Sequence, residues 1–242
     1  MRRFLIFTKA MFLIHLRNRE VLFWNFAFPI FLMVIYGIIM RAYIAWLTPG
    51  VIVLNALSFG LVASAAVLVE MREKGILRRL RATPLPANQL LGAYLIVNLL
   101  LGLGQGAIIL LAAVLLYQVP LSAAGLALGL PMIIAGALTF LALGQIVSGL
   151  AKKAGAATAM GMTLYFGLMF ISDMIFPLSQ LPQWLQKVVP YLPSYLVTQL
   201  VRSPLIEGVA DPRWLAHLAG LAIYSVTASV IASRVFQWDP RS

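Results

Sequence analysis

The sequence predicts an all-α membrane protein with six transmembrane helices. Of its 242 residues, 62% are hydrophobic and 10% are charged, whereas soluble domains have roughly 45–50% apolar and about 25% charged residues. The mean hydropathy is +0.96, and the apolar residues fall in long blocks rather than in alternation. Because one span takes about 20 residues, we expect a single transmembrane domain over 1–242 and no sizeable soluble domain.

Each apolar block is long enough to cross a bilayer core of about 30 Å. The third and fourth blocks exceed that length, so we expect tilt or frayed ends there. Between the fifth and sixth blocks, a stretch rich in proline, glutamine and aromatic residues predicts short outer helices, one of them at about 182–189. The spans are predicted at about 21–40, 49–69, 90–117, 123–150, 154–176 and 214–236.

The N-terminal segment mixes apolar and basic side chains and predicts an interfacial helix over 1–20. Such a helix lies along the inner leaflet, with its apolar side in the acyl region and its cations on anionic membrane lipid. A signal peptide is one alternative, but Lys9 and His15 interrupt its apolar core and no small-residue cleavage site follows. A featureless basic anchor for the first span is the other alternative.

A charged segment, 70–84, separates the second and third apolar blocks, and we call it the elbow. It holds five of the 18 basic residues and two of the 7 acidic residues of the chain. On insertion scales each Lys or Arg at mid-membrane costs about 2.5–3.5 kcal/mol, so the elbow cannot lie in hydrocarbon. We therefore expect it to join two spans at the membrane surface, where a soluble partner could push on it.

Lysine and arginine are divided unevenly between the two sides that six spans would create. Fourteen lie in 1–20, the elbow, the turn 151–155 and the tail from Arg234, and four lie on the other side. Cytoplasmic loops of membrane proteins carry an excess of these residues. The distribution predicts a multi-pass protein of the plasma (inner) membrane, with both termini and the elbow in the cytoplasm.

Composition and motifs argue against several other functions. The net charge of +11 could indicate nucleic-acid binding, but the cytoplasmic loops account for it, and we expect no nucleic-acid partner. The sequence lacks a G-x-x-x-x-G-K-[ST] phosphate loop, so we expect no ATPase site in this chain. With no cysteine, and with neither His15 nor His217 near a second metal-type ligand at useful spacing, it predicts no metal site, catalytic residue or bound cofactor.

The elbow carries an alternating acidic and basic run that ends in glycine, followed by leucine, basic residues and Ala-Thr-Pro. Its residues are Glu70, Arg72, Glu73, Lys74, Gly75, Leu77, Arg79, Leu80, Arg81, Ala82, Thr83 and Pro84. This pattern resembles the elbow of membrane subunits of ATP-binding-cassette (ABC) exporters of the type-2 permease class, which includes drug-export permeases. Ile76 and Arg78 depart from it, where threonine and an acid are common. Leu47-Thr48-Pro49-Gly50 and the proline-rich stretch 176–193 extend the resemblance along nearly the whole chain.

The resemblance implies that two permease subunits, identical or related, pack around a central path. Each would sit on a separate ABC ATPase subunit, which binds the ATP and Mg. The elbow would be the coupling helix in a groove of that ATPase, with Gly75 turning the chain and Leu77 and Leu80 making an apolar contact. The alternative is that the elbow is only a charge cluster that sets the topology.

In the resembling family the second and fifth spans border the path, so Asn55, Met169, Asp173 and Met174 are candidates for lining it. Each has a plainer interpretation as well. Asparagine commonly hydrogen-bonds between membrane helices, and methionine is ordinary filling. Asp173, the one acid within a predicted span, is either a solvated acid at a helix end or a gate residue.

The resemblance implies a permease subunit of an ABC exporter that moves a hydrophobic or amphiphilic compound, drug-like or lipid-like, outward. Export of a lipid-linked glycan is the neighbouring alternative. An ion-coupled secondary carrier is disfavoured, because such a carrier usually needs more acids within its spans than Asp173. A non-transporting membrane scaffold for an ATPase would have similar sequence features.

Overall fold

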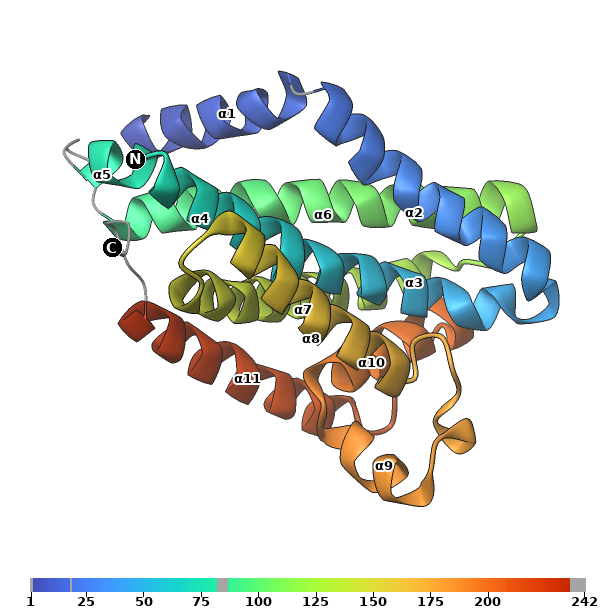
Figure 1. The fold of residues 1–242 in the computed structure, drawn as a ribbon. Helices are drawn as coiled ribbons and strands as arrows, with labels where there is room; N and C mark the ends of the chain where they lie inside the picture. Colours follow the sequence, from blue (N-terminus) through green and yellow to red (C-terminus); the bar gives the residue numbers. More distant parts are fainter. Residues whose placement is uncertain (1, 18, 82–86, 236–242) are drawn as a thin grey trace.

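The computed structural model describes residues 2–17, 19–81 and 87–235, and the regular structure in these ranges is helical (Figure 1). The apolar helical stretch Phe26–Ile39 is shorter than the helices named below as candidate spans. The all-helical class is confirmed, and the six-span layout stays a prediction. Within the described residues, five helices are long and apolar enough to cross a membrane by length and composition: Arg41–Glu73, Gly92–Tyr117, Ala123–Leu150, Ala154–Ile171 and Trp214–Val235.

The N-terminal part of the chain forms two helices, α1 (Arg2–Arg17) and α2 (Arg19–Ile39), that make a V resting on α6 (Ala87–Tyr117) (Figure 1). Met11 of α1 lies in one buried cluster with Tyr94 of α6. The helix predicted at the N-terminus is therefore present and packs against the bundle. Its position at the membrane interface stays a prediction.

At the predicted second span, α3 (Ile44–Ser58), a π-helical turn (Phe59–Ala63) and α4 (Ser64–Glu73) follow one another without a break, and we call this rod the second span. This rod starts earlier and ends later than the predicted 49–69. The residues before 49 are helical and packed, since Leu47 in the first turn of α3 is fully buried in the core. The end of the rod carries the first four residues of the elbow, which are thus part of the span helix and not of a separate coupling helix.

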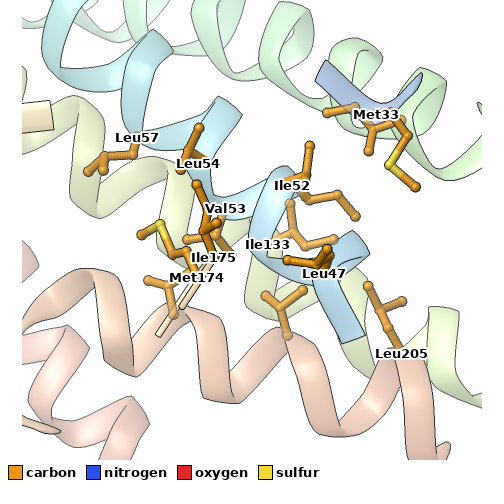
Figure 2. Packing of buried hydrophobic residues seen from close by; sticks show 14 of the residues in the cluster. Met33, Leu47, Ile52, Val53, Leu54, Leu57, Ile133, Met174, Ile175 and Leu205 are labelled. Atoms are coloured by element: carbon orange, nitrogen blue, oxygen red, sulfur yellow. The ribbon is translucent and has the colours of Figure 1, made fainter. Parts of the chain in front are cut away.

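The hydrophobic core surrounds α3. Figure 2 shows its buried side chains, Leu47 to Leu57, close to Ile133 of α7 (Ala123–Leu150) and Leu205 of α10 (Pro193–Glu207). In the candidate span that contains α3, 61% of the apolar window is buried, against 17–44% in the others. The second span is therefore the enclosed helix of the bundle, and the others have more surface free for lipid or a partner.

The helix at the predicted fifth span, α8 (Ala154–Ile171), ends before the predicted limit at 176. The segment that follows Ile171 is not helical, and its residues Met174 and Ile175 are buried in the core beside α3 (Figure 2). A Cβ on Gly50 of α3 would overlap the backbone carbonyl of Met174. The residues after α8 therefore belong to the packed interior, and not to a continuing span.

The predicted outer-helix stretch holds α9 (Gln183–Val188) and α10, and α11 (Trp214–Val235) follows. The two outer helices differ, because α9 has no buried residue while most of α10 is buried against α7 and α3. Figure 1 shows α9 at the end of the bundle away from α5 (Ile76–Arg81). The start of α1 lies near α5, and Val235 of α11 touches the end of α7 at Gly149.

Candidate functional site

The elbow turns between α4 and α5 at Lys74 and Gly75. The N–H groups of these two residues donate to the carbonyls of Glu70 (2.9 Å) and Arg72 (3.0 Å). Gly75 has φ +66°, the left-handed region that glycine adopts without strain. The glycine therefore ends the span helix and redirects the chain, as the sequence predicted.

Leu77 lies on the inner side of α5 and is only 1% exposed. It shares a buried cluster with Met11 of α1, Leu68 of α4 and Tyr94 of α6. The expectation that Leu77 offers an apolar contact to a partner is therefore wrong for this conformation, because its side chain anchors α5 to the bundle. The side chains of Leu80 and Arg81, and residues 82–86 with Thr83 and Pro84, lie outside the described residues.

Exposed charges cover the outer side of the elbow. Lys74 and Glu70 form an ion pair of 2.5 Å one turn apart, and both are exposed. Arg79 donates to the carbonyl of Lys74 at 3.3 Å. Arg78, Lys152 and Lys153 are exposed as well, the last two in the turn between α7 and α8. This face is polar and predominantly basic, which suits an acidic soluble partner.

Arg72 and Glu73 point toward the turn between α7 and α8. Arg72 is only 3% exposed. Its guanidinium donates to the carbonyl of Ser148 at 3.1 Å and to that of Ala151. The Glu73 carboxylate accepts from the N–H of Ala154 at 3.1 Å. The expectation that Arg72 belongs to a docking surface is therefore wrong for this conformation, because its guanidinium is buried and hydrogen-bonded to carbonyls within the protein.

A hollow of about 270 Å³ lies between α2, the second span and α6. Among the path candidates, Asn55 lines it, and its side-chain amide donates to Oε1 of Gln105 at 3.0 Å. Aromatic rings and a hydroxyl complete the wall. The lining residues are Trp24, Phe28, Pro29, Asn55, Ser58, Phe59, Ala63 and Gln105.

The two methionine candidates lie elsewhere. Met169 is half-buried against the core, and Met174 is fully buried in it. Neither residue lines the hollow that holds Asn55. Lining of a path by Met174 therefore requires a conformation other than this one, in which the segment after α8 has left the core.

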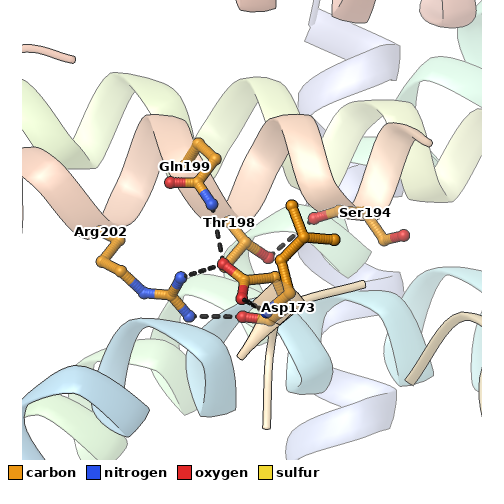
Figure 3. Close-up of polar contacts among 6 residues, drawn as sticks. Asp173, Ser194, Thr198, Gln199 and Arg202 are labelled. Carbon is orange, nitrogen blue, oxygen red and sulfur yellow. Dashed lines mark hydrogen bonds and ion pairs between the residues drawn. The ribbon is translucent and has the colours of Figure 1, made fainter. Parts of the chain in front are cut away.

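Asp173 lies in a buried polar cluster between the end of α8 and α10 (Figure 3). Its carboxylate accepts from Arg202 at 2.5 Å, from Gln199 at 2.8 Å and from the N–H of Leu178 at 2.7 Å. Arg202 also donates to the Asp173 carbonyl at 2.5 Å and stacks over Trp46 of α3 at 4.0 Å. Burial lowers the pKa of the Arg202 guanidinium, while the carboxylate acts in the opposite direction.

The structure therefore excludes one of the two interpretations of Asp173. A solvated acid at a helix end is wrong, because the carboxylate is buried and paired with Arg202. Arg202 was not predicted to be a site residue, because it lies between the predicted spans 154–176 and 214–236. Its position as the one charged residue in the stretch 196–206 was the signal that could have revealed a buried role.

Comparison with known proteins identifies the family. Residues 2–206 match the family described as ABC-2 type transporter. The chain belongs to this ABC-2 family. The resemblance to type-2 permeases is thereby confirmed, and the apolar helices together with the family identify a multi-pass membrane protein.

Two curated proteins are similar to this chain in sequence. It is 25% identical over 203 residues to the "ABC transporter G family member 20" of Dictyostelium discoideum, an alignment that covers 82% of this chain and 28% of that protein. It is 26% identical over 187 residues to the "Putative transport permease YvfS" of Bacillus subtilis (strain 168), covering 74% of this chain and 76% of that protein. The chain thus spans less than a third of the Dictyostelium relative.

Proposed function

We propose that this chain is the permease subunit of an ABC exporter and that ATP and Mg bind to a separate ATPase subunit. The observation that carries the proposal is the elbow of an ABC-2 family member, a short helix with exposed basic residues that Leu77 anchors to three other helices. A force on α5 would therefore reach α1, α4 and α6 together. The exposed residues Lys74, Arg78 and Arg79, with the undescribed Thr83 and Pro84, are the proposed docking side.

We propose six spans, with α2 as the first span and both termini in the cytoplasm. Helix α2 has 21 residues, enough for a bilayer core of about 30 Å, although its strongly apolar part is shorter. The excess of Lys and Arg on the elbow side supports this orientation.

We propose that the cargo is hydrophobic or amphiphilic and that two permease subunits form the path. The hollow beside Asn55 supports this cargo class, because it combines aromatic walls with amide groups. A lipid-linked glycan also has an apolar part and a polar part, and is the neighbouring candidate. A role of Asp173 as a gate would act through the Arg202 pair.

Reconstitution with a cognate ATPase tests the proposal. We expect no ATP hydrolysis by the purified chain, and co-purification with a phosphate-loop ATPase encoded beside it. In vesicles, the complex should hydrolyse ATP and expel a fluorescent amphiphile, which a complex with a phosphate-loop Lys→Ala ATPase should not do.

The alternatives predict other results. Uptake or release driven by a proton gradient without ATP would indicate a secondary carrier. A complex that hydrolyses ATP but moves neither amphiphile nor lipid-linked glycan would indicate a scaffold. Hydrolysis by the chain alone would overturn the proposal.

A further inference from the structure

The groups that Arg72 and Glu73 contact are the unpaired ends of two helices. The last carbonyls of a helix and its first N–H groups lack partners within that helix. Lys153, at the N-cap of α8, makes no side-chain cap, and the Glu73 carboxylate from α4 supplies one. The charges also match, with a cation at the negative end of α7 and an anion at the positive end of α8.

Close packing joins the same elements over a longer distance. Val69 of α4, Ala151 in the turn between α7 and α8, and Ala157 of α8 form a buried cluster. Farther along, a Cβ on Gly144 of α7 would overlap the carbonyl of Gly60 in the π-helical turn. Backbones in such contact cannot slide independently, so the two charges lie at the end of an already tight interface.

The link from these charges to α5 is short. Glu73 is the last residue of α4, and only the turn at Lys74 and Gly75 separates it from α5. The two backbone hydrogen bonds of that turn end on Glu70 and Arg72. A displacement of α5 would thus reach, among its neighbours, the part of α4 that holds the turn between α7 and α8.

We infer that Arg72 and Glu73 are positioning residues that form a clamp, through which movement of the elbow is delivered to α7 and α8. We use "clamp" for these two side chains with their acceptors and donor on Ser148, Ala151 and Ala154. The inference rests on the proposed function, which supplies the ATPase that moves α5. It assigns the two residues an internal role, distinct from docking of the partner.

The first test uses the purified chain without an ATPase. Because the sequence has no cysteine, Arg78→Cys and Lys152→Cys place one spin label on α5 and one on the turn between α7 and α8. Labelled chain diluted with unlabelled chain should give a single narrow distance peak in nanodiscs. Arg72→Met, which removes the guanidinium, and Glu73→Ala, which removes the carboxylate, should each cause loss of that narrow peak.

Matched variants separate the clamp from a general loss of folding. Glu73→Gln keeps an oxygen that can accept from Ala154 and should retain the narrow peak, as should Arg72→Lys in part. Glu70→Gln breaks the exposed pair with Lys74 on the same helix and should leave the distances unchanged. A narrow peak in both Arg72→Met and Glu73→Ala would overturn the inference.

The second test adds the ATPase with ATP and vanadate. Labels at Lys152→Cys and Glu207→Cys should report a nucleotide-dependent shift in the wild type. So should labels at Ile76→Cys, a half-buried α5 residue outside the proposed docking side, and Glu207→Cys. In Arg72→Met the first shift should be lost while the second remains. Retention of both shifts in that variant would overturn the clamp. Absence of both shifts in the wild type would count against the proposed function, while the result of the first test would be unaffected.

Discussion

Asp173 and Arg202 form a buried ion pair in a largely apolar chain. The carboxylate accepts from a guanidinium, an amide and a backbone N–H, so its charge is compensated by the protein in place of water. Trp46 covers the guanidinium from the side of α3. The pair therefore ties three segments together: the start of the second span, the residues after α8, and α10.

Asp173→Asn is expected to destabilise the protein strongly. It removes one charge and leaves that of Arg202 buried without its partner, which costs about 3–5 kcal/mol in comparable buried pairs. The measurement is the thermal unfolding midpoint in detergent, which should fall well below that of the wild type.

Glu207→Gln is the matched control, since it makes the same chemical change at an exposed acid on α10. Its unfolding midpoint should stay close to the wild-type value. If Asp173→Asn were as stable as this control, the ion pair would have no structural role. Altered transport at unchanged stability would then favour the gate.

At the scale of elements, the second span and α7 meet through glycines. Gly60 lies in the π-helical turn and Gly144 faces it, so the two backbones touch without side chains between them. A Cβ on Gly161 of α8 would likewise overlap the carbonyl of Leu61. Small residues allow such close approach of membrane helices.

Gly144→Ala is expected to destabilise the bundle, because its Cβ would overlap backbone that cannot rotate away. Overpacking of this kind costs about 1–3 kcal/mol and more where backbone must move. The thermal unfolding midpoint and the fraction of monodisperse protein should both decrease.

Gly167→Ala provides the comparison, because nothing lies within 4 Å of its added Cβ. A mid-helix glycine costs roughly 0.5–1 kcal/mol relative to alanine, so this variant should be as stable as the wild type or more stable. Equal behaviour of the two variants would show that the helix contact at Gly144 yields easily.

At the scale of the whole molecule, the two ends of the bundle differ in charge. The end with α5 carries exposed Lys74, Arg78, Arg79, Lys152 and Lys153, whereas the opposite end has exposed Arg41, Lys187 and Arg213. Such an asymmetry orients a membrane protein with its basic end in the cytoplasm.

Cysteine labelling in intact cells tests this orientation. A membrane-impermeant maleimide should label Lys187→Cys in whole cells, and Lys152→Cys only after the membrane is opened. The unmodified chain, which has no cysteine, is the background control. Labelling of Lys152→Cys in whole cells would reverse the proposed orientation.

Most of the helices could be predicted from the sequence, because a span is defined by its own composition. The limits of α7, 123–150, agree with the prediction. The helix limits at Ile44, Glu73 and Ile171 could not be predicted in this way, since each depends on contacts with residues distant in the chain. The buried positions of Leu77 and Arg72 were missed for the same reason.

By itself, the sequence determined that the chain is an α-helical membrane protein, where its charged elbow lies and which family it resembles. These properties follow from local composition, because the free energy of transferring a residue into lipid depends chiefly on the type of that residue. Only the tertiary structure decided that Asp173 is paired, that Leu77 is an anchor and that Arg72 and Glu73 cap α7 and α8. The energy of a buried polar group depends on partners from other helices, and those partners are set by the packing of the whole bundle.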